Sequence, residues 1–209
     1  MYKRQFQESG RRVTLYKGVR EWFARINAYG AARGIRILHY INSSGLKEII
    51  EGTEIAHEFR RIYACSFLYD IDGVAYWPAV AVNYTNKTQF IFKINKGVES
   101  VFDSKLVNQY IEEDKRPVPF RRMIYVGDGT TDIPCMRLVK NSGGHSIAVY
   151  NPEIRNARRE LNGLIRDNRV SHVCPADYSE GSEMDTLVKT IIDKIEADHR
   201  LELLETPRT

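Results

Sequence analysis

The chain has 209 residues, of which 43% are hydrophobic and 28% are charged, a balance typical of a globular domain and unlike that of a disordered or low-complexity segment. No apolar run approaches the roughly 18 residues of a membrane-spanning helix, and the N-terminal residues lack the apolar stretch of a secretory signal. Three cysteines at irregular spacing and a formal net charge of +4 favour a reducing, cytoplasmic setting and do not by themselves indicate a nucleic-acid partner.

The first third of the chain is predicted to be mostly helical, with one strand. Apolar residues spaced as on one face of a helix predict a helix over residues 19–26. The short apolar run 35–41 predicts a strand, and a helical pattern starts again at Leu46. Thr53 can cap a further helix whose apolar positions continue to Ile62.

Residues 62–84 change character and are predicted to form a small insertion. The β-prone runs 62–69 and 74–77 flank Asp70-Ile71-Asp72-Gly73, a sequence typical of a tight turn, and therefore predict a hairpin. Residues 85–97 suit either a helix or a strand, and we favour a helix.

Strands and helices alternate clearly in the second half. Strands are predicted over 123–126, 145–150 and 170–173, and helices over 133–139, 151–165 and 184–195. This alternation predicts an α/β fold, doubly wound, with a mainly parallel sheet that carries the hairpin as an insertion. In such sheets ligands bind beyond the carboxyl ends of the strands, so the residues that follow the predicted strands are candidates for a site.

Ser43-Ser44-Gly45 follows the first predicted strand and precedes a predicted helix. Free backbone N–H groups at a helix N-terminus, together with serine hydroxyls, can hold a phosphate or a carboxylate. The alternative is that a serine of this turn only caps the helix.

Asp128 and Asp132 lie in a glycine-containing turn directly after the strand predicted over 123–126. Two carboxylates four residues apart at a sheet edge can share one Mg²⁺, which usually keeps water and substrate phosphate as its other ligands. Alternatively, Asp128 shapes the turn and Asp132 caps the helix that begins at Ile133.

Lys96, beside Gly97, would on its own be interpreted as a solvated surface charge. Taken in order, however, the serine-glycine turn, the hairpin that starts at Tyr63-Ala64, the lysine and the Gly127–Asp132 turn resemble the haloacid dehalogenase-like hydrolase superfamily. The layout is most similar to its phosphoserine-phosphatase-like members, which are Mg²⁺-dependent phosphatases. The resemblance spans about residues 18–195.

The resemblance implies a phosphate-binding role for four of these residues. Ser43 matches the hydroxyl that hydrogen-bonds the transferring phosphoryl group, and Ser44 and Gly45 match backbone donors to phosphate oxygens. Lys96 matches the cation that neutralises charge between nucleophile and phosphate. These roles agree with phosphoryl transfer, in which the protein mainly positions the group and neutralises its charge.

The resemblance also implies a metal site and a substrate class. Asp128 matches the direct Mg²⁺ ligand, and Asp132 matches its second or outer-sphere ligand. The implied substrate is a small-molecule phosphomonoester, and neither nucleic acid nor a membrane is expected as a partner.

One part of the family's machinery is missing from this sequence. The chemistry of the family begins with an Asp-x-Asp pair upstream of the serine, whereas no aspartate precedes Ser43 here. Asp70 and Asp72 match that pattern locally, but they follow the serine motif and are explained by the hairpin turn.

Two main hypotheses therefore describe the function. In the first, residues 1–209 are one partial core domain, the C-terminal part of a longer Mg²⁺-dependent phosphatase, inactive without its nucleophile. In the second, the chain is a catalytically inactive protein of the same fold that binds phosphate or a phosphometabolite. A weaker third hypothesis, nucleic-acid binding, rests on the arginine pairs at 60–61, 121–122 and 158–159, which are scattered among acidic residues.

Overall fold

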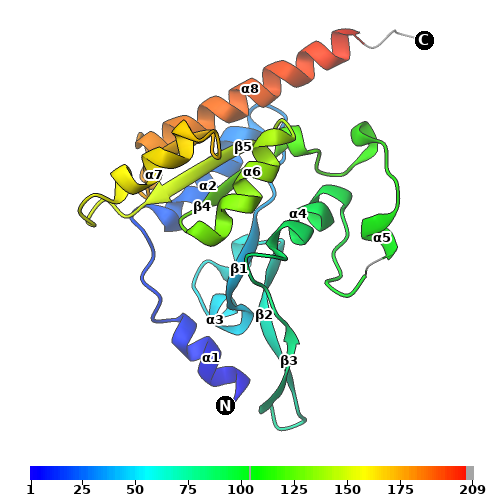
Figure 1. Ribbon diagram of the computed structural model, residues 1–209, viewed down its shortest axis with the longest axis vertical. Coiled ribbons are helices and arrows are strands. Elements are labelled where there is room, and N and C mark those ends of the chain that lie inside the picture. Colours follow the sequence, from blue (N-terminus) through cyan, green and yellow to red (C-terminus); the bar gives the residue numbers. More distant parts are fainter. Residues whose placement is uncertain (104, 206–209) are drawn as a thin grey trace. The chain divides into compact units, whose positions relative to one another are not determined.

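A computed structural model describes residues 1–103 and 105–205 and has an α/β fold with two three-stranded sheets (Figure 1). One sheet is mixed, with strand order β1-β2-β3, and the other is parallel, with order β4-β5-β6. The chain divides into two compact units, each built from separate stretches. The first unit contains Met1–Thr14, Leu38–Phe120 and Gly129–Leu138, and the second contains Leu15–Ile37, Arg121–Asp128 and the chain from Val139 onward.

The first unit holds the mixed sheet. Its strands are β1 (Tyr40–Leu46), β2 (Arg61–Tyr69) and β3 (Ala75–Val80). β1 runs parallel to β2, whereas β2 and β3 form the predicted antiparallel hairpin. The helical elements are α1 (Lys3–Gly10), α3 (Lys47–Glu51), η1 (Ala56–Glu58), α4 (Lys87–Lys96), α5 (Lys105–Asn108), η2 (Glu113–Lys115), η4 (Thr130–Asp132) and the first part of α6 (Ile133–Asn141).

The core of the first unit lies between the mixed sheet and α4. The rings of Tyr63 on β2 and Phe90 on α4 stack with their centroids 5.3 Å apart, and Val82 packs against both. Phe90 and Ile91 are each only 2% exposed, because α4 turns the face that carries them inward. The helix favoured for residues 85–97 is therefore present.

The first strand lies later in the sequence than predicted. Residues 35–39 are not in a strand, and β1 begins at Tyr40, opposite Arg61, where β2 begins. Asn42 then faces Tyr63 and Leu46 faces Cys65, so β1 carries extra residues that bulge from the ladder. Ser43-Ser44-Gly45 is this bulge and is not a turn after the strand.

The helix predicted from Thr53 is wrong. Only the short 3₁₀ turn η1 forms there, and Ile62 already belongs to β2. The hydroxyl of Thr53 donates to the carbonyl of Ile50 at 2.7 Å, so it closes the preceding helix and does not cap a new one.

Helix α1 was not predicted, and it docks on α3 through backbone contact. A Cβ on Gly10 would overlap the carbonyl oxygen of Ile49, and one on Gly52 would overlap the carbonyl oxygen of Gln7. Beside this contact the rings of Phe6 and Phe67 stack with their centroids 5.7 Å apart. The N-terminal segment is thus an integral part of the first unit.

The second unit holds the parallel sheet and its helices. Its elements are α2 (Val19–Ala31), β4 (Ile124–Gly127), the end of α6, β5 (His145–Tyr150), α7 (Ala157–Arg166), β6 (His172–Pro175) and α8 (Glu183–Glu205), with the 3₁₀ turn η3 (Phe120–Arg122) at the boundary of the units. The order agrees with the prediction, but α7 starts late. The side chain of Asn151 accepts the N–H of Glu153 at 3.0 Å, and this turn delays the helix.

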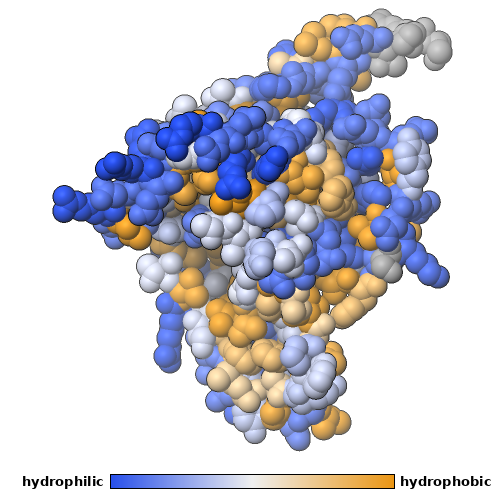
Figure 2. Space-filling model, viewed as in Figure 1, coloured by the Kyte–Doolittle hydropathy of each residue, from blue (hydrophilic) through white to orange (hydrophobic). Residues whose placement is uncertain are grey.

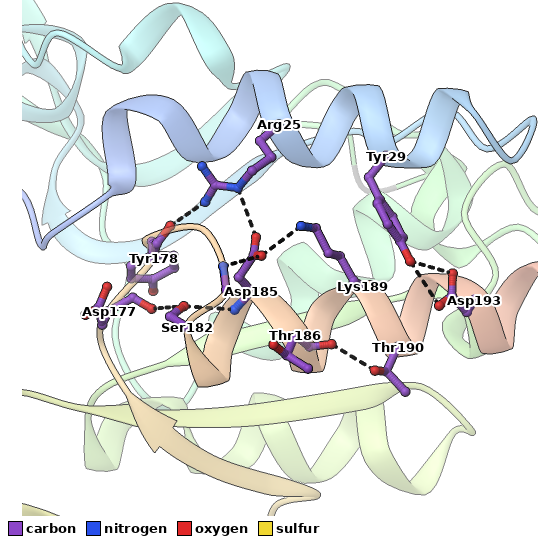
Figure 3. Close-up of polar contacts among 11 residues, drawn as sticks. Arg25, Tyr29, Asp177, Tyr178, Ser182, Asp185, Thr186, Lys189, Thr190 and Asp193 are labelled. Carbon is purple, nitrogen blue, oxygen red and sulfur yellow. Dashed lines mark hydrogen bonds and ion pairs between the residues drawn. The ribbon is translucent and has the colours of Figure 1, made fainter.

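Polar side chains join α2 to α8 (Figure 3). Asp185 on α8 is 1% exposed and accepts from Arg25 at 3.0 Å, from Lys189 at 2.8 Å and from the N–H of Gly181 at 2.9 Å. Burial acts to raise the pKa of Asp185, but these donors outweigh it and hold that pKa below its ordinary value. One turn after Arg25 on α2, the hydroxyl of Tyr29 donates to Asp193 on α8 at 3.0 Å.

Within residues 1–103 and 105–205, no helix has the length and apolar composition that crossing a bilayer would require.

Candidate functional site

The most unusual polar contact of the first unit is an ion pair between Lys87 and Asp132. Lys87 Nζ lies 2.6 Å from Asp132 Oδ1, and the two side chains are only 5% and 9% exposed. A buried ammonium or carboxylate loses its hydration, and the opposite charge beside it offsets part of that cost. The pair joins the start of α4 to η4, the turn that contains the second predicted metal ligand.

Side-chain hydrogen bonds of the segment before α4 fix the position of Lys87. The side chain of Asn83 accepts the N–H of Thr85 at 2.9 Å, and the side chain of Asn86 accepts the N–H of Asn83 at 2.8 Å. Asn86 also donates to the carbonyl of Ala81 at 2.8 Å. These local bonds stop the extended chain after β3 and set the first turn of the helix.

Asn42 links β1 to the same helix turn. Its Nδ2 donates to the backbone carbonyl of Lys87 at 3.0 Å and lies 3.9 Å from Sγ of Cys135. Asn42 immediately precedes the Ser43-Ser44-Gly45 bulge, so the bulge, the start of α4 and η4 are tied together within one unit.

The bulge itself presents Ser44 and Gly45 to solvent, while Ser43 is half-buried. Ser43 Oγ accepts the N–H of Gly45 at 3.0 Å, which folds the bulge on itself. Helix α3 begins only at Lys47 and has five residues. The predicted phosphate cradle therefore consists of a strand bulge, and not of a loop at the N-terminus of a long helix.

Lys96 stands at the other end of α4, and its ammonium is engaged elsewhere. It donates to the carbonyl oxygens of Val107 at 2.7 Å and Gln109 at 2.6 Å. The structure thus brings Lys87, and not Lys96, to the carboxylate of Asp132.

The sequence contained a signal for Lys87. Lys87, Phe90, Ile91 and Ile94 are spaced as i, i+3, i+4 and i+7, so the lysine occupies the apolar face of its helix. A lysine at such a position needs a buried partner. Its place on the apolar face is therefore a stronger indication of the site lysine than its order relative to other motifs.

Asp128 follows β4 in the second unit and is exposed. Burial of Tyr178, followed by the charges of Cys174 and Asp128, raises the pKa of the Tyr178 hydroxyl. Tyr178 therefore stays a neutral hydroxyl within electrostatic reach of the Asp128 carboxylate.

Hard carboxylate oxygens at Asp128 and Asp132 have the donor chemistry that Mg²⁺ prefers. Within the described part of the chain, no three His, Cys, Asp or Glu side chains gather closely enough to hold a metal by themselves. Mg²⁺ commonly uses only one or two protein carboxylates, so each aspartate by itself has suitable donor chemistry. Asp132 Oδ1 of the first unit is taken by Lys87, whereas Asp128 of the second unit is exposed.

Asp70 and Asp72 form the hairpin turn. Asp70 Oδ1 accepts the N–H of Asp72 at 3.0 Å and that of Val74 at 2.8 Å, and Gly73 has a φ of 78°, which glycine adopts readily. These contacts account for the Asp-x-Asp-Gly sequence through turn geometry alone.

Two of the three arginine pairs are engaged within the chain. Arg60 and Arg61 both donate to Glu99, at 2.7 and 2.6 Å, and Glu202 similarly accepts from the pair at 121–122. The pair at 158–159 lies exposed on α7, where Figure 2 shows strongly hydrophilic side chains. Intramolecular ion pairs therefore explain most of the pattern that suggested nucleic acid.

Comparison with known proteins gives a relative but no family. No family model matches the chain. A protein of Borreliella burgdorferi, described only as uncharacterised, is 29% identical over 177 residues, which cover 75% of this chain and 56% of the relative. The chain thus spans about half the length of the relative that it matches.

Proposed function

We propose that the chain is a phosphate-binding α/β protein of the haloacid dehalogenase-like type, similar to the phosphoserine-phosphatase-like members, with Lys87 as its phosphate-site lysine. The observation that carries this proposal is the buried ion pair of Lys87 and Asp132. An ammonium has three N–H donors, and one of them is used on Asp132. In the proposed site the others would donate to phosphate oxygens, whose charge the lysine would neutralise.

Each further residue has a defined part in this proposal. The Ser43 hydroxyl and the backbone N–H of Ser44 would donate to phosphate oxygens from the bulge, whereas the N–H of Gly45 is already donated to Ser43 Oγ. Asp132 holds the ammonium of Lys87 in place through the buried ion pair. Asp128, which belongs to the second unit, has a carboxylate of the kind that would hold Mg²⁺.

The parent reaction would be hydrolysis of a phosphomonoester through an aspartyl-phosphate. No aspartate precedes Ser43 in this chain, and the contacts of Asp70 support its role in a turn. We therefore expect binding without turnover. Both main hypotheses, the part of a longer phosphatase and the inactive phosphate binder, require the same phosphate site in this chain.

The test is calorimetric titration of the chain with inorganic phosphate, with and without Mg²⁺. The variant Lys87→Met, Asp132→Leu removes both charges of the pair together, which avoids leaving one of them buried alone. Phosphate binding should be lost in this variant and retained in Lys96→Met. No binding by the unmodified chain, or loss on Lys96→Met alone, would overturn the proposal.

A second assay addresses turnover with p-nitrophenyl phosphate and Mg²⁺. No hydrolysis is expected from this chain. Robust hydrolysis that disappears in Asp70→Asn would instead identify the hairpin aspartate as a nucleophile and contradict the assignment of that turn.

A further inference from the structure

Two asparagines of the first unit, Asn42, which is half-buried, and Asn95, which is buried, have the same hydrogen-bonding pattern at opposite ends of α4. Asn42 donates through Nδ2 to the carbonyl of Lys87, and Asn95 donates through Nδ2 to the carbonyl of Val118 at 2.8 Å. In both residues the amide oxygen is buried, and no hydrogen-bond partner for it lies within the described part of the chain. The two asparagines differ in the residue to which they donate. Only Asn42 donates to Lys87, the lysine of the buried ion pair.

The orientation of the Asn42 amide follows from its surroundings. If the amide were reversed, its oxygen would face the carbonyl oxygen of Lys87 at 3.0 Å, and two acceptors would repel each other. Nδ2 therefore faces Lys87, and Oδ1 is the atom left without a donor.

Satisfying the backbone does not explain this contact. The carbonyl of the first residue of an α-helix already accepts an N–H from the following turn, so Lys87 does not need a side-chain donor there. A buried acceptor without a partner is a cost to folding, and an apolar side chain at this strand position would avoid it. The amide at residue 42 thus has a use other than stability.

We propose that Asn42 is a positioning residue: it fixes the first turn of α4 through the carbonyl of Lys87 and thereby sets the ammonium of Lys87 against Asp132. Lys87 Nζ is separated from its backbone by a flexible four-carbon chain, and anchoring the backbone end restricts the positions that the ammonium can reach. The effect on phosphate rests on the function proposed above, whereas the positioning itself does not.

The positioning is tested by ¹H–¹⁵N NMR of lysine ammonium groups in the full chain. Lys87 and Lys93 are each only 4% exposed on α4, and Lys93 donates to the carbonyls of Ser100 and Asp103, so both should give protected signals. The variant Lys87→Met assigns the Lys87 signal. In Asn42→Ala that signal should broaden or vanish while the Lys93 signal stays unchanged.

Asn95→Ala is the matched control. It removes the same kind of buried amide from the same unit and should leave the Lys87 signal as it is. An unchanged Lys87 signal in Asn42→Ala, or an equal loss in both variants, would overturn the positioning role.

Titration of both variants with inorganic phosphate gives the functional consequence. Affinity should fall about tenfold in Asn42→Ala, the loss typical when a group that orients a binding residue is removed, and should not change in Asn95→Ala. If the unmodified chain does not bind phosphate, the proposed function fails while the NMR result still decides the positioning. If it binds and Asn42→Ala binds equally well, the link between Asn42 and phosphate is wrong.

Discussion

The two ends of α4 each carry a lysine, and the two lysines stand in opposite physical situations. Lys96 lies in the last turn, where the helix dipole favours a cation, and it donates to two loop carbonyls. Lys87 is the first residue of the helix, where the dipole disfavours a cation, and its side chain is almost completely buried. Stability explains a lysine at residue 96 but not one at residue 87, and this difference is why we assign the phosphate site to Lys87.

The largest effect is expected from Lys87→Met. The substitution leaves the carboxylate of Asp132 buried without its cation, which should lower the free energy of unfolding by about 3–5 kcal/mol. Urea denaturation measures the loss, and adding Asp132→Leu should restore most of it. A loss below about 1 kcal/mol would mean that the pair is solvated and that the contrast between the two lysines is unfounded.

Gly10→Ala tests whether the effect of Lys87→Met is specific to the site. The new methyl group would overlap the carbonyl of Ile49, so α1 must shift on α3 and the free energy of unfolding should fall by about 1–3 kcal/mol. Phosphate affinity should remain unchanged.

Gly163→Ala in α7 is the control for Gly10→Ala. Its nearest neighbour is the far end of the Arg166 side chain at 3.9 Å, so the substitution should stabilise the chain by about 0.5–1 kcal/mol. Equal effects of the two substitutions would contradict the backbone contact between α1 and α3.

A smaller effect is expected from Lys96→Met. Two charge-assisted hydrogen bonds to loop carbonyls are lost, but no buried charge is left behind, so the free energy of unfolding should fall by about 1–2 kcal/mol. If the loss equals that of Lys87→Met in the same urea assay, the two ends of the helix are energetically alike.

Mild acid should lower the free energy of unfolding, because three histidines resist protonation in the folded protein. Burial lowers the pKa of His39, His145 and His172. Unfolded histidines take up protons below pH of about 6.5, while the folded ones still resist, so stability should fall as the pH drops through that value. Urea midpoints that do not change between pH 7.5 and 5.5 would contradict this, and the lysine variants are best compared above pH 7.

Periodic burial made much of the fold predictable from the sequence. Trp22, Phe23 and Ile26 are buried on α2, and Met184 and Val188 are buried on α8, as their spacing predicted. Helix α1 has no comparable stripe and packs through Gly10, so hydrophobic spacing could not reveal it. The start of β1 is set by its pairing with the start of β2, so it could not be predicted from the residues of β1 alone.

The candidate site was predictable in its residue types but not in its partners. The turn containing Asp132 was identified from its sequence, whereas its lysine was chosen by order along the chain and not by burial. Lys87 shares its helix face with Phe90, Ile91 and Ile94, and that pattern would have indicated a buried ammonium. No sequence pattern pointed to Asn42, because the carbonyl to which it donates, that of Lys87, lies 45 residues further along the chain.

The most direct test of the Lys87 assignment is to add inorganic phosphate to the ¹⁵N-lysine-labelled chain and follow the ammonium signals. The Lys87 signal should shift with phosphate in a saturable manner, while the signals of Lys93 and Lys96 should stay in place. A saturable shift at Lys96 with none at Lys87, or no saturable shift at all, would contradict the assignment of the phosphate site to the start of α4.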